Sequence, residues 1–281
     1  LERAQGLGVE IRAPLRCTSL RTDQDRPALE TEDSEVLDAD LILLASGVTP
    51  DWFDDLGISI QERPAHTHAL VFNAVFPGRQ AGCAFERFTQ HGPLAVLPLP
   101  STHRHEQRYN VVWSVSNSTA TTFGDLDDEA FRNHFQDAFG WRLGRVQAVG
   151  RRSQWPLMRL SASEQFRAGF LLVGNAAHTL HPVAGQGLNL SLREAGLLAQ
   201  AIADAQQRSA AIGCCASLKT YLDQVSDEQR LVVDSTDALA ILFNRRGPLL
   251  DVPRDASLAL LDLLPAIRQQ VASVGTGRRY A

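Results

Sequence analysis

The residues with the clearest chemical potential lie in one stretch, from Val173 to Leu190. It reads Val-Gly-Asn-Ala-Ala-His-Thr-Leu-His-Pro-Val-Ala-Gly-Gln-Gly-Leu-Asn-Leu. A strand pattern ends at Gly174, and the turn Gly185-Gln186-Gly187 opens a helical pattern. The free N–H groups and the positive dipole end at a helix start attract an anion or a polar ring. The stretch therefore predicts a cradle for such a group, although the glycines alone fit a tight strand–turn–helix joint equally well.

Two short apolar runs must position this cradle. Residues 170–174 and residues 39–47 each read as a strand buried in a parallel sheet, with a glycine at the carboxyl end. That end of the strands is where α/β folds bind ligands. Apolar residues then recur at helical spacing from Gly187 to Gln207. The sequence therefore places the cradle at the joint between a buried strand and a long helix.

The rest of the chain has a different sequence pattern. Residues 59–150 contain short β-rich segments separated by turn signals, which predict a largely antiparallel sheet inserted into the first layer. A helix is predicted from Asp127 to Phe139, with Asp125 as its N-cap and Gly140 as its stop. Val9 to Ile11 is predicted to begin a strand, and residues 217–272 are helical by pattern.

Composition narrows the function classes. The 281 residues are 44% apolar and 21% charged with a net charge of −5, which is typical of a soluble globular protein with a sizeable core. No basic block suggests a nucleic-acid partner. No apolar run approaches the roughly 20 residues that a spanning helix needs. The four scattered cysteines favour reduced thiols and a cytoplasmic location over a disulfide framework.

Two other kinds of chemistry lack support. The histidine pairs His66/His68, His103/His105 and His178/His181 have no accompanying cluster of cysteine or carboxylate ligands, so no metal site is expected. His178 is expected to pack or hydrogen-bond behind the glycine turn. No Gly-x-Ser-x-Gly elbow occurs, so serine hydrolysis is not indicated.

The full string resembles the second flavin-contacting motif of the FAD-dependent aromatic-ring monooxygenases related to p-hydroxybenzoate hydroxylase. In that family a Gly-Asp pair at a strand end reaches the ribityl chain, and a Pro-x-x-Gly-Gln-Gly-x-Asn turn places helix N–H groups under the flavin ring. Asn175 stands where the family has aspartate, and an amide can still hydrogen-bond a hydroxyl. The resemblance implies that Pro182 and Val183 lie beside the ring. It implies the following cofactor contacts: Gly174, Asn175, Pro182, Ala184, Gly185, Gln186, Gly187, Leu188 and Asn189.

Two further strings are similar to the 2-octaprenyl-6-methoxyphenol hydroxylases of ubiquinone biosynthesis: residues 84–99 and Phe-Gly-Trp-Arg-Leu-Gly at 139–144. The resemblance implies a monooxygenase that hydroxylates a polyprenylated phenol with FAD, NAD(P)H and O2. Its substrate cavity is expected at the inserted sheet, with Phe85, Arg87, Leu97 and Pro98 as candidates. At any one of these positions a purely structural role is at least as well supported as substrate binding. The apolar residues would then pack in the sheet core, and Arg87 would be a solvated charge.

Two nucleotide-binding elements of the family are absent or altered. No Gly-x-Gly-x-x-Gly turn follows a strand and opens a helix, since Gly6-Leu7-Gly8 lacks the third glycine. The family's Ala-Asp-Gly falls at residues 45–47, where Ser46 and Gly47 are candidate contacts without a carboxylate. We therefore expect an N-terminally truncated flavoprotein that is colourless or substoichiometric in flavin when purified. The alternative function is a non-catalytic remnant or interaction module.

The expected fold is mixed α/β. Residues 1–58 would form a partial FAD/NAD(P)-binding domain lacking its first βαβ unit, and 59–150 an inserted, mainly antiparallel β-sheet substrate domain. Residues 151–207 would return to the FAD-binding domain, and 208–281 would form a helical C-terminal region. The leucine-rich face at residues 249–267 leaves three alternatives open: packing on the flavin layer, a homo-oligomer contact, or resting on a membrane surface. The first two are favoured because the segment has few arginines and several aspartates. The resemblance also allows a ubiquinone-biosynthesis complex as a partner and a location peripheral to the inner membrane.

Overall fold

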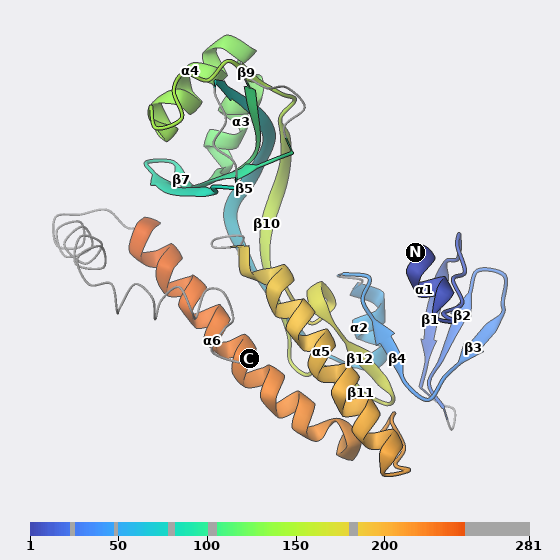
Figure 1. The fold of residues 1–281 in the computed structure, drawn as a ribbon. Helices are drawn as coiled ribbons and strands as arrows, with labels where there is room; N and C mark the ends of the chain where they lie inside the picture. Colours follow the sequence, from blue (N-terminus) through green and yellow to red (C-terminus); the bar gives the residue numbers. More distant parts are fainter. Residues whose placement is uncertain (23–25, 48–49, 78–81, 101–105, 180–184, 245–281) are drawn as a thin grey trace. The chain divides into compact units, whose positions relative to one another are not determined.

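The chain forms two compact units, which are described separately (Figure 1). The computed structural model describes residues 1–22, 26–47, 50–77, 82–100, 106–179 and 185–244. The first unit draws on residues 1–61, 160–179 and 190–228, and the second on the described residues among 62–159, 180–189 and 229–281. The mixed α/β class with antiparallel sheets is confirmed, whereas the domain boundaries expected from the sequence stay predictions.

A three-stranded sheet in the order β11-β12-β4 lies at the centre of the first unit. Strand β12 (Phe170–Leu172) pairs in parallel with β4 (Ile42–Leu44) and antiparallel with β11 (Phe166–Arg167). Both apolar runs that predicted strands of a parallel sheet are therefore confirmed. Helix α2 (Pro50–Leu56) packs Phe53 and Leu56 into the same apolar cluster as Phe170 and Leu172.

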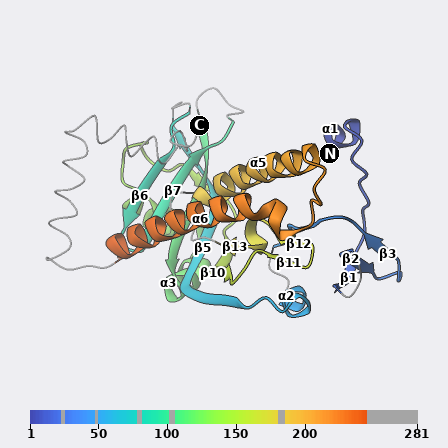
Figure 2. The same cartoon turned by 90° about the horizontal axis from the view of Figure 1, so that it is seen from below.

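Helices α5 (Gln186–Gln207) and α6 (Cys215–Asn244) lie side by side in two perpendicular views (Figure 1 and Figure 2). They share an apolar cluster with β12 that includes Leu171, Leu198 and Tyr221. The predicted helix to Gln207 is confirmed, as is the helical tail as far as Asn244. The leucine-rich face at 249–267 lies outside the described residues. No helix within the described ranges has a stretch apolar and long enough to cross a membrane.

The N-terminal region corrects one sequence prediction. After α1 (Glu2–Gly6), residues 9–16 form no strand, and Val9 and Ile11 are exposed. Pro14 follows closely and has no N–H to donate to a sheet ladder, so this short apolar run finds no pairing partner. A separate antiparallel sheet follows, made of β1 (Cys17–Arg21), β2 (Ala28–Thr31) and β3 (Val36–Asp38). All four cysteines are free thiols, as predicted.

The larger sheet has the order β13-β10-β5-β8-β7-β6, with β9 beside β5. Its strands are β5 (Ile60–Pro77), β6 (Phe85–Thr89), β7 (Gly92–Pro98), β8 (Glu106–Ser116), β9 (Ala148–Val149), β10 (Ser153–Ala162) and β13 (His178–Thr179). The recorded registers within residues 62–159 are antiparallel, which confirms the predicted sheet type. Alternate residues of β5 are buried because successive side chains of a strand point to opposite faces: Leu70, Phe72, Ala74 and Phe76.

Helix α4 (Asp128–Phe139) covers the buried face of this sheet. Phe131, Phe135 and Phe139 recur every four residues on one side of the helix and are buried. The rings of Phe131 and Phe135 meet Phe72 edge-on, with centroids 4.9 and 5.1 Å apart. The predicted helix and its stop at Gly140 are therefore confirmed.

The predicted N-cap of α4 is wrong by two residues. The carboxylate of Asp127 accepts a hydrogen bond from the N–H of Ala130, 2.7 Å away. Asp125 is instead the last residue of α3 (Asn117–Asp125), a helix that the sequence did not predict. Because α3 continues through Asp125, that side chain is not placed to cap the next helix.

Replacing Asp127 by alanine is expected to lower the free energy of unfolding by about 1 kcal/mol, since the Ala130 N–H loses its acceptor. Chemical unfolding followed by tryptophan fluorescence, to which Trp113 buried in this sheet contributes, measures the loss. Asp125→Ala is the matched control and should change the unfolding free energy by much less. Equal losses in the two variants would contradict the capping assignment.

Candidate cofactor site

The carboxyl ends of β4 and β12 meet at one edge of the first unit's sheet. Leu44 is paired with Leu172, and the N–H of Val173 donates to the carbonyl of Leu44 at 3.0 Å. The residues that follow the two strands, Ser46-Gly47 and Gly174-Asn175, therefore leave the sheet from the same edge. The structure brings together two candidate cofactor-binding pairs that are more than 120 residues apart in the sequence.

Gly174 is favoured at this edge by its backbone conformation. It begins the 3-10 turn η1 (Gly174–Ala176) with a φ of +58°, a backbone conformation that favours glycine. A Cβ at this position would lie 3.4 Å from the Oγ of Ser191 in α5. The side chain of Asn175 is exposed beside it. A carboxamide is thus presented at the strand end, where it can bond a ligand hydroxyl.

The start of α5 carries the remaining candidates within the described residues. Leu188 and Asn189 are exposed in its first turn, and a Cβ built on Gly185 or Gly187 would meet no described atom within 4 Å. A helix start presents N–H groups and a partial positive charge. These features suit a flat polar ring that gains negative charge. Pro182, Val183 and Ala184 lie outside the described residues.

A buried histidine–glutamate pair joins β13 to α5. The Nε2 of His178 lies 2.8 Å from Oε1 of Glu194, and the two residues are 4% and 2% exposed. Because a carboxylate only accepts hydrogen bonds, the imidazole Nε2–H donates to it. The Nδ1 of His178 is buried without a hydrogen-bond partner in the described part of the chain. The pair thus ties together the two elements that flank residues 180–185, and the expected hydrogen bond of His178 is confirmed.

Tyr221 of α6 belongs to the same buried environment. Burial, and then the negative charge of Glu194, raise the pKa of the Tyr221 hydroxyl. Neither residue was assigned a role from the sequence. A signal was present for Glu194, because it lies between buried Leu190 and Leu198 at a spacing of four, on the apolar stripe of α5. A charged residue on such a stripe indicates a buried partner.

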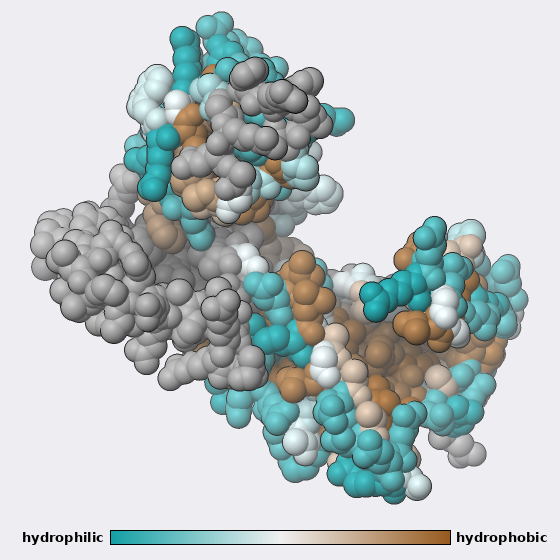
Figure 3. Space-filling model, viewed as in Figure 1, coloured by the Kyte–Doolittle hydropathy of each residue, from teal (hydrophilic) through white to brown (hydrophobic). Residues whose placement is uncertain are grey.

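Apolar side chains are exposed on the face of the first unit around α2 and β4 (Figure 3). Leu43 of β4 is also exposed. Leu43 points away from the buried Ile42 and Leu44, since alternate residues of a strand face opposite sides. Leu43 belongs to the strand that Ser46 and Gly47 follow. Apolar walls beside a few polar groups are the usual lining of a site for a small organic ligand.

The four candidate substrate-contacting residues do not share one face of their sheet. Phe85 pairs with Val96, and Arg87 pairs with Leu94, so both lie on the buried face that α4 covers. Pro98 follows Val96 by two positions on that face, whereas Leu97 lies on the opposite face. The guanidinium of Arg87 donates to the carbonyl of Phe139 at the end of α4. Their roles in substrate binding stay predictions.

Metal ligands are not clustered in the part of the chain that the structure describes: no group of three or more histidine, cysteine, aspartate or glutamate side chains could hold an ion. The described polar groups at the strand edge are a carboxamide, a hydroxyl and backbone N–H groups. These groups suit the hydroxyls and ring heteroatoms of an organic cofactor.

The comparison with known families identifies the class of protein. Residues 1–236 match the model of the FAD binding domain family. The chain therefore belongs to this family. The structure is similar to p-nitrophenol 4-monooxygenase PnpA from Pseudomonas putida, with a TM-score of 0.71 and 18% identity over 92% of this chain and 65% of that one. This likeness supports the fold.

Curated relatives include hydroxylases of ubiquinone. The chain is 33% identical over 232 residues to ubiquinone hydroxylase UbiL of Rhodospirillum rubrum, covering 83% of this chain and 53% of that protein. It is 24% identical over 269 residues to 3-demethoxyubiquinol 3-hydroxylase of Escherichia coli, covering 96% and 67%. The expected likeness to this group of flavin-dependent hydroxylases is confirmed. The chain spans about half the length of the first relative and two thirds of the second.

The residues present fit the flavin end of FAD. Glycines at the start of α5 leave open space where a Cβ would otherwise stand, and the nearby helix N–H groups suit a ring with carbonyl oxygens. Asn175 and Ser46 present an amide and a hydroxyl at the strand edge, groups that can bond the hydroxyls of a cofactor. The strand edge of the first unit therefore suits cofactor hydroxyls through two neutral side chains, and residues 185–189, which belong to the second unit, suit the ring.

Proposed function

We propose that this chain acts as an FAD-dependent monooxygenase that hydroxylates a polyprenylated phenol in ubiquinone biosynthesis, using NAD(P)H and O2. The observation that carries the proposal is the shared edge of β4 and β12, where Gly174 and Asn175 begin the segment that resembles a flavin-contacting motif. The similarity to a ubiquinone hydroxylase of Rhodospirillum rubrum supports the substrate class.

In this proposal the protein binds and orients the cofactor and substrate. Asn175 bonds the ribityl hydroxyls, and Ser46 and Gly47 contact the cofactor from the neighbouring strand end. The N–H groups at residues 185–189 stabilise negative charge on the ring. Pro182 and Val183 lie beside the ring, with Ala184 as a further contact. When bound, FAD supplies the redox chemistry by which O2 delivers one oxygen atom to the phenol.

A second candidate function is a non-catalytic module that keeps the fold without flavin turnover. The observation that favours it is the pair of neutral side chains, Asn175 and Ser46, where the resembling family carries carboxylates. A neutral acceptor forms a weaker hydrogen bond than a carboxylate, so cofactor affinity falls. The free state of all four cysteines supports a cytoplasmic location for either candidate. Peripheral membrane contact through residues 249–267 is part of the first proposal only.

An FAD titration followed by a turnover assay separates the two candidates. The purified chain is titrated with FAD and then mixed with NADH or NADPH, O2 and a short-chain prenylphenol. The monooxygenase proposal predicts NAD(P)H oxidation that depends on added FAD, together with a product heavier by one oxygen atom. Flavin binding without either signal supports the non-catalytic module. Absence of flavin binding contradicts the cofactor site itself.

Replacing Asn175 by aspartate is expected to tighten riboflavin binding about fivefold, because hydrogen bonds to a charged acceptor are stronger by about 1 kcal/mol. Riboflavin is the probe because it has the ring and the ribityl chain but no phosphate to repel the added charge. Quenching of its fluorescence gives the dissociation constant. Asn73→Asp, an exposed position on β5, is the matched control and should leave the constant unchanged. Equal constants for all three proteins would contradict the assigned role of Asn175.

A further inference from the structure

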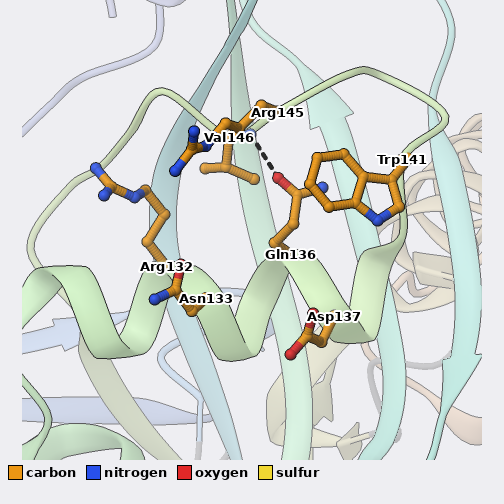
Figure 4. A pocket seen from close by; sticks show the side chains of 7 residues that line it. All are labelled: Arg132, Asn133, Gln136, Asp137, Trp141, Arg145 and Val146. Atoms are coloured by element: carbon orange, nitrogen blue, oxygen red, sulfur yellow. Dashed lines mark hydrogen bonds between the residues drawn. The ribbon is translucent and has the colours of Figure 1, made fainter.

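A second candidate binding site lies on the other unit, between α4 and the segment that follows it (Figure 4). This pocket has a volume of about 250 Å³ and is lined by residues within 132–137 and 141–146. It includes part of the Phe-Gly-Trp-Arg-Leu-Gly string at 139–144, which the proposed flavin chemistry does not use. The pocket therefore needs an explanation of its own.

Buried Gln136 holds the two sides of this pocket together. Its Nε2 donates to the carbonyl of Gly140 at 2.8 Å and to that of Gly144 at 3.3 Å. Its Oε1 accepts from the N–H of Val146 at 2.7 Å, the bond drawn in Figure 4. The amide thus fastens the segment to the helix at three points. A site whose walls are held in this way loses little conformational entropy when a ligand binds.

Two arginines supply positive charge to one side of the pocket. Figure 4 shows the guanidinium groups of Arg132 and Arg145 on the same side, away from Trp141. Arg132 makes only a long hydrogen bond, 3.4 Å, to the carbonyl of Gln147. Arg145 has no ion-pair or hydrogen-bond partner within the described ranges. Two such groups in a small pocket match the geometry of a carboxylate or phosphate.

The opposite side of the pocket presents an aromatic ring. Trp141 is 66% exposed and stacks against no other ring among the described residues. Asp137 lies one helical turn earlier, with an exposed carboxylate that has no partner in the described part of the chain. Tryptophan and arginine are the residue types that carry most of the binding energy in recognition sites. A carboxylate beside them accepts a hydrogen bond from a ligand amine or hydroxyl.

We propose that this pocket binds a small ligand made of a flat ring joined to a phosphate or carboxylate group. The anion lies between Arg132 and Arg145, the ring stacks on Trp141, and a donor on the ring bonds Asp137. At about 250 Å³ the pocket is below the roughly 300–1,000 Å³ of sites for drug-sized ligands. It therefore takes one ring system with its anion, such as a nucleoside monophosphate or a smaller aromatic acid, and not a whole dinucleotide. This proposal does not depend on flavin binding.

Calorimetric titration with four probes tests the ligand class. Adenosine 5′-monophosphate combines a ring with a phosphate, and benzoate combines a ring with a carboxylate. Adenosine and inorganic phosphate are the ring alone and the anion alone. We expect at least one of the two combined probes to bind about tenfold more tightly than adenosine and phosphate, and the better one identifies the anion. Failure of both combined probes to bind at millimolar concentration, or phosphate binding as tightly as they do, overturns the proposal.

Two variants with matched controls test the location of the site. Arg145→Gln and Trp141→Ala should each weaken binding of the better probe about tenfold, since each removes a principal contact. Arg151→Gln and Trp155→Ala are the controls. Arg151 is exposed, and the exposed fraction of Trp155, 62%, is similar to that of Trp141. The controls should bind the probe as the unmodified chain does. Equal effects of variants and controls would show that the probe binds elsewhere and would overturn the proposal.

Discussion

Replacing Glu194 by alanine is expected to lower the free energy of unfolding by about 3–5 kcal/mol, the usual loss when one partner of a buried pair is removed. Glu194 and His178 are both almost fully buried, and their side chains lie 2.8 Å apart. Without the carboxylate, neither ring nitrogen of His178 has a hydrogen-bond partner among the described residues. Denaturant unfolding measures this loss. Riboflavin affinity should fall as well, because the pair ties β13 to α5 on either side of residues 180–185.

Three further variants test whether the loss of stability comes from the broken His178–Glu194 pair. Glu194→Gln keeps an acceptor for the imidazole and should lose much less stability than Glu194→Ala. The double variant His178→Leu/Glu194→Leu removes both polar groups and should recover part of the loss, since no buried polar group is left unpaired. Glu129→Ala, an exposed position on α4, should change the unfolding free energy by less than about 1 kcal/mol. A loss in Glu194→Ala as small as that of the exposed control would contradict the role of the pair.

Replacing Gly92 by alanine is expected to lower the free energy of unfolding by about 3 kcal/mol. Gly92 stands at the turn between β6 and β7 with a φ of +130°, a conformation that side chains rarely adopt. A Cβ there would collide with the backbone carbonyl of Ser114 on β8, and a carbonyl held in a sheet ladder has little freedom to move. Trp113 lies next to Ser114 and is fully buried, so its fluorescence reports the unfolding of this sheet.

The variant Gly82→Ala distinguishes the free-energy cost of backbone strain from the cost of a steric collision. Gly82 also has a positive φ, +73°, but a Cβ there would meet nothing within 4 Å. Its replacement should therefore lower the free energy of unfolding by only about 1 kcal/mol, the cost of the left-handed conformation alone. A loss in Gly92→Ala no larger than in Gly82→Ala would contradict the predicted collision with Ser114.

The elements with strong local patterns could be predicted from the sequence. Residues 42–44 and 170–172 were predictable because continuous apolar runs mark strands of parallel sheets. Helix α3 was missed because its sequence, Asn-Ser-Thr-Ala-Thr-Thr-Phe-Gly-Asp, is poor in helix formers. Tertiary contacts stabilise this helix instead. Ser116 caps its start, and Ala120 and Phe123 are buried against the sheet.

In the candidate site, too, positions set by local sequence could be predicted, whereas contacts between distant residues could not. Gly174 and Asn175 could be placed at a strand end from the sequence, and the structure puts them beside Ser46 and Gly47 through the pairing of β12 with β4. The partner of His178 could not be predicted, because Glu194 lies sixteen positions further along the chain. The different faces of Phe85 and Leu97 depend on the register between β6 and β7, which no local pattern reveals.

The most direct test of the proposed cofactor site is an amide NMR spectrum of the purified chain, recorded before and after the addition of riboflavin. We predict that the shifted signals include the backbone amides of Gly47, Gly174, Asn175 and Gly187, at the shared edge of β4 and β12 and at the start of α5. The amides around Trp141 in the second pocket should not move. Shifts confined to that pocket, or no shifts at millimolar riboflavin, would contradict the proposed cofactor site.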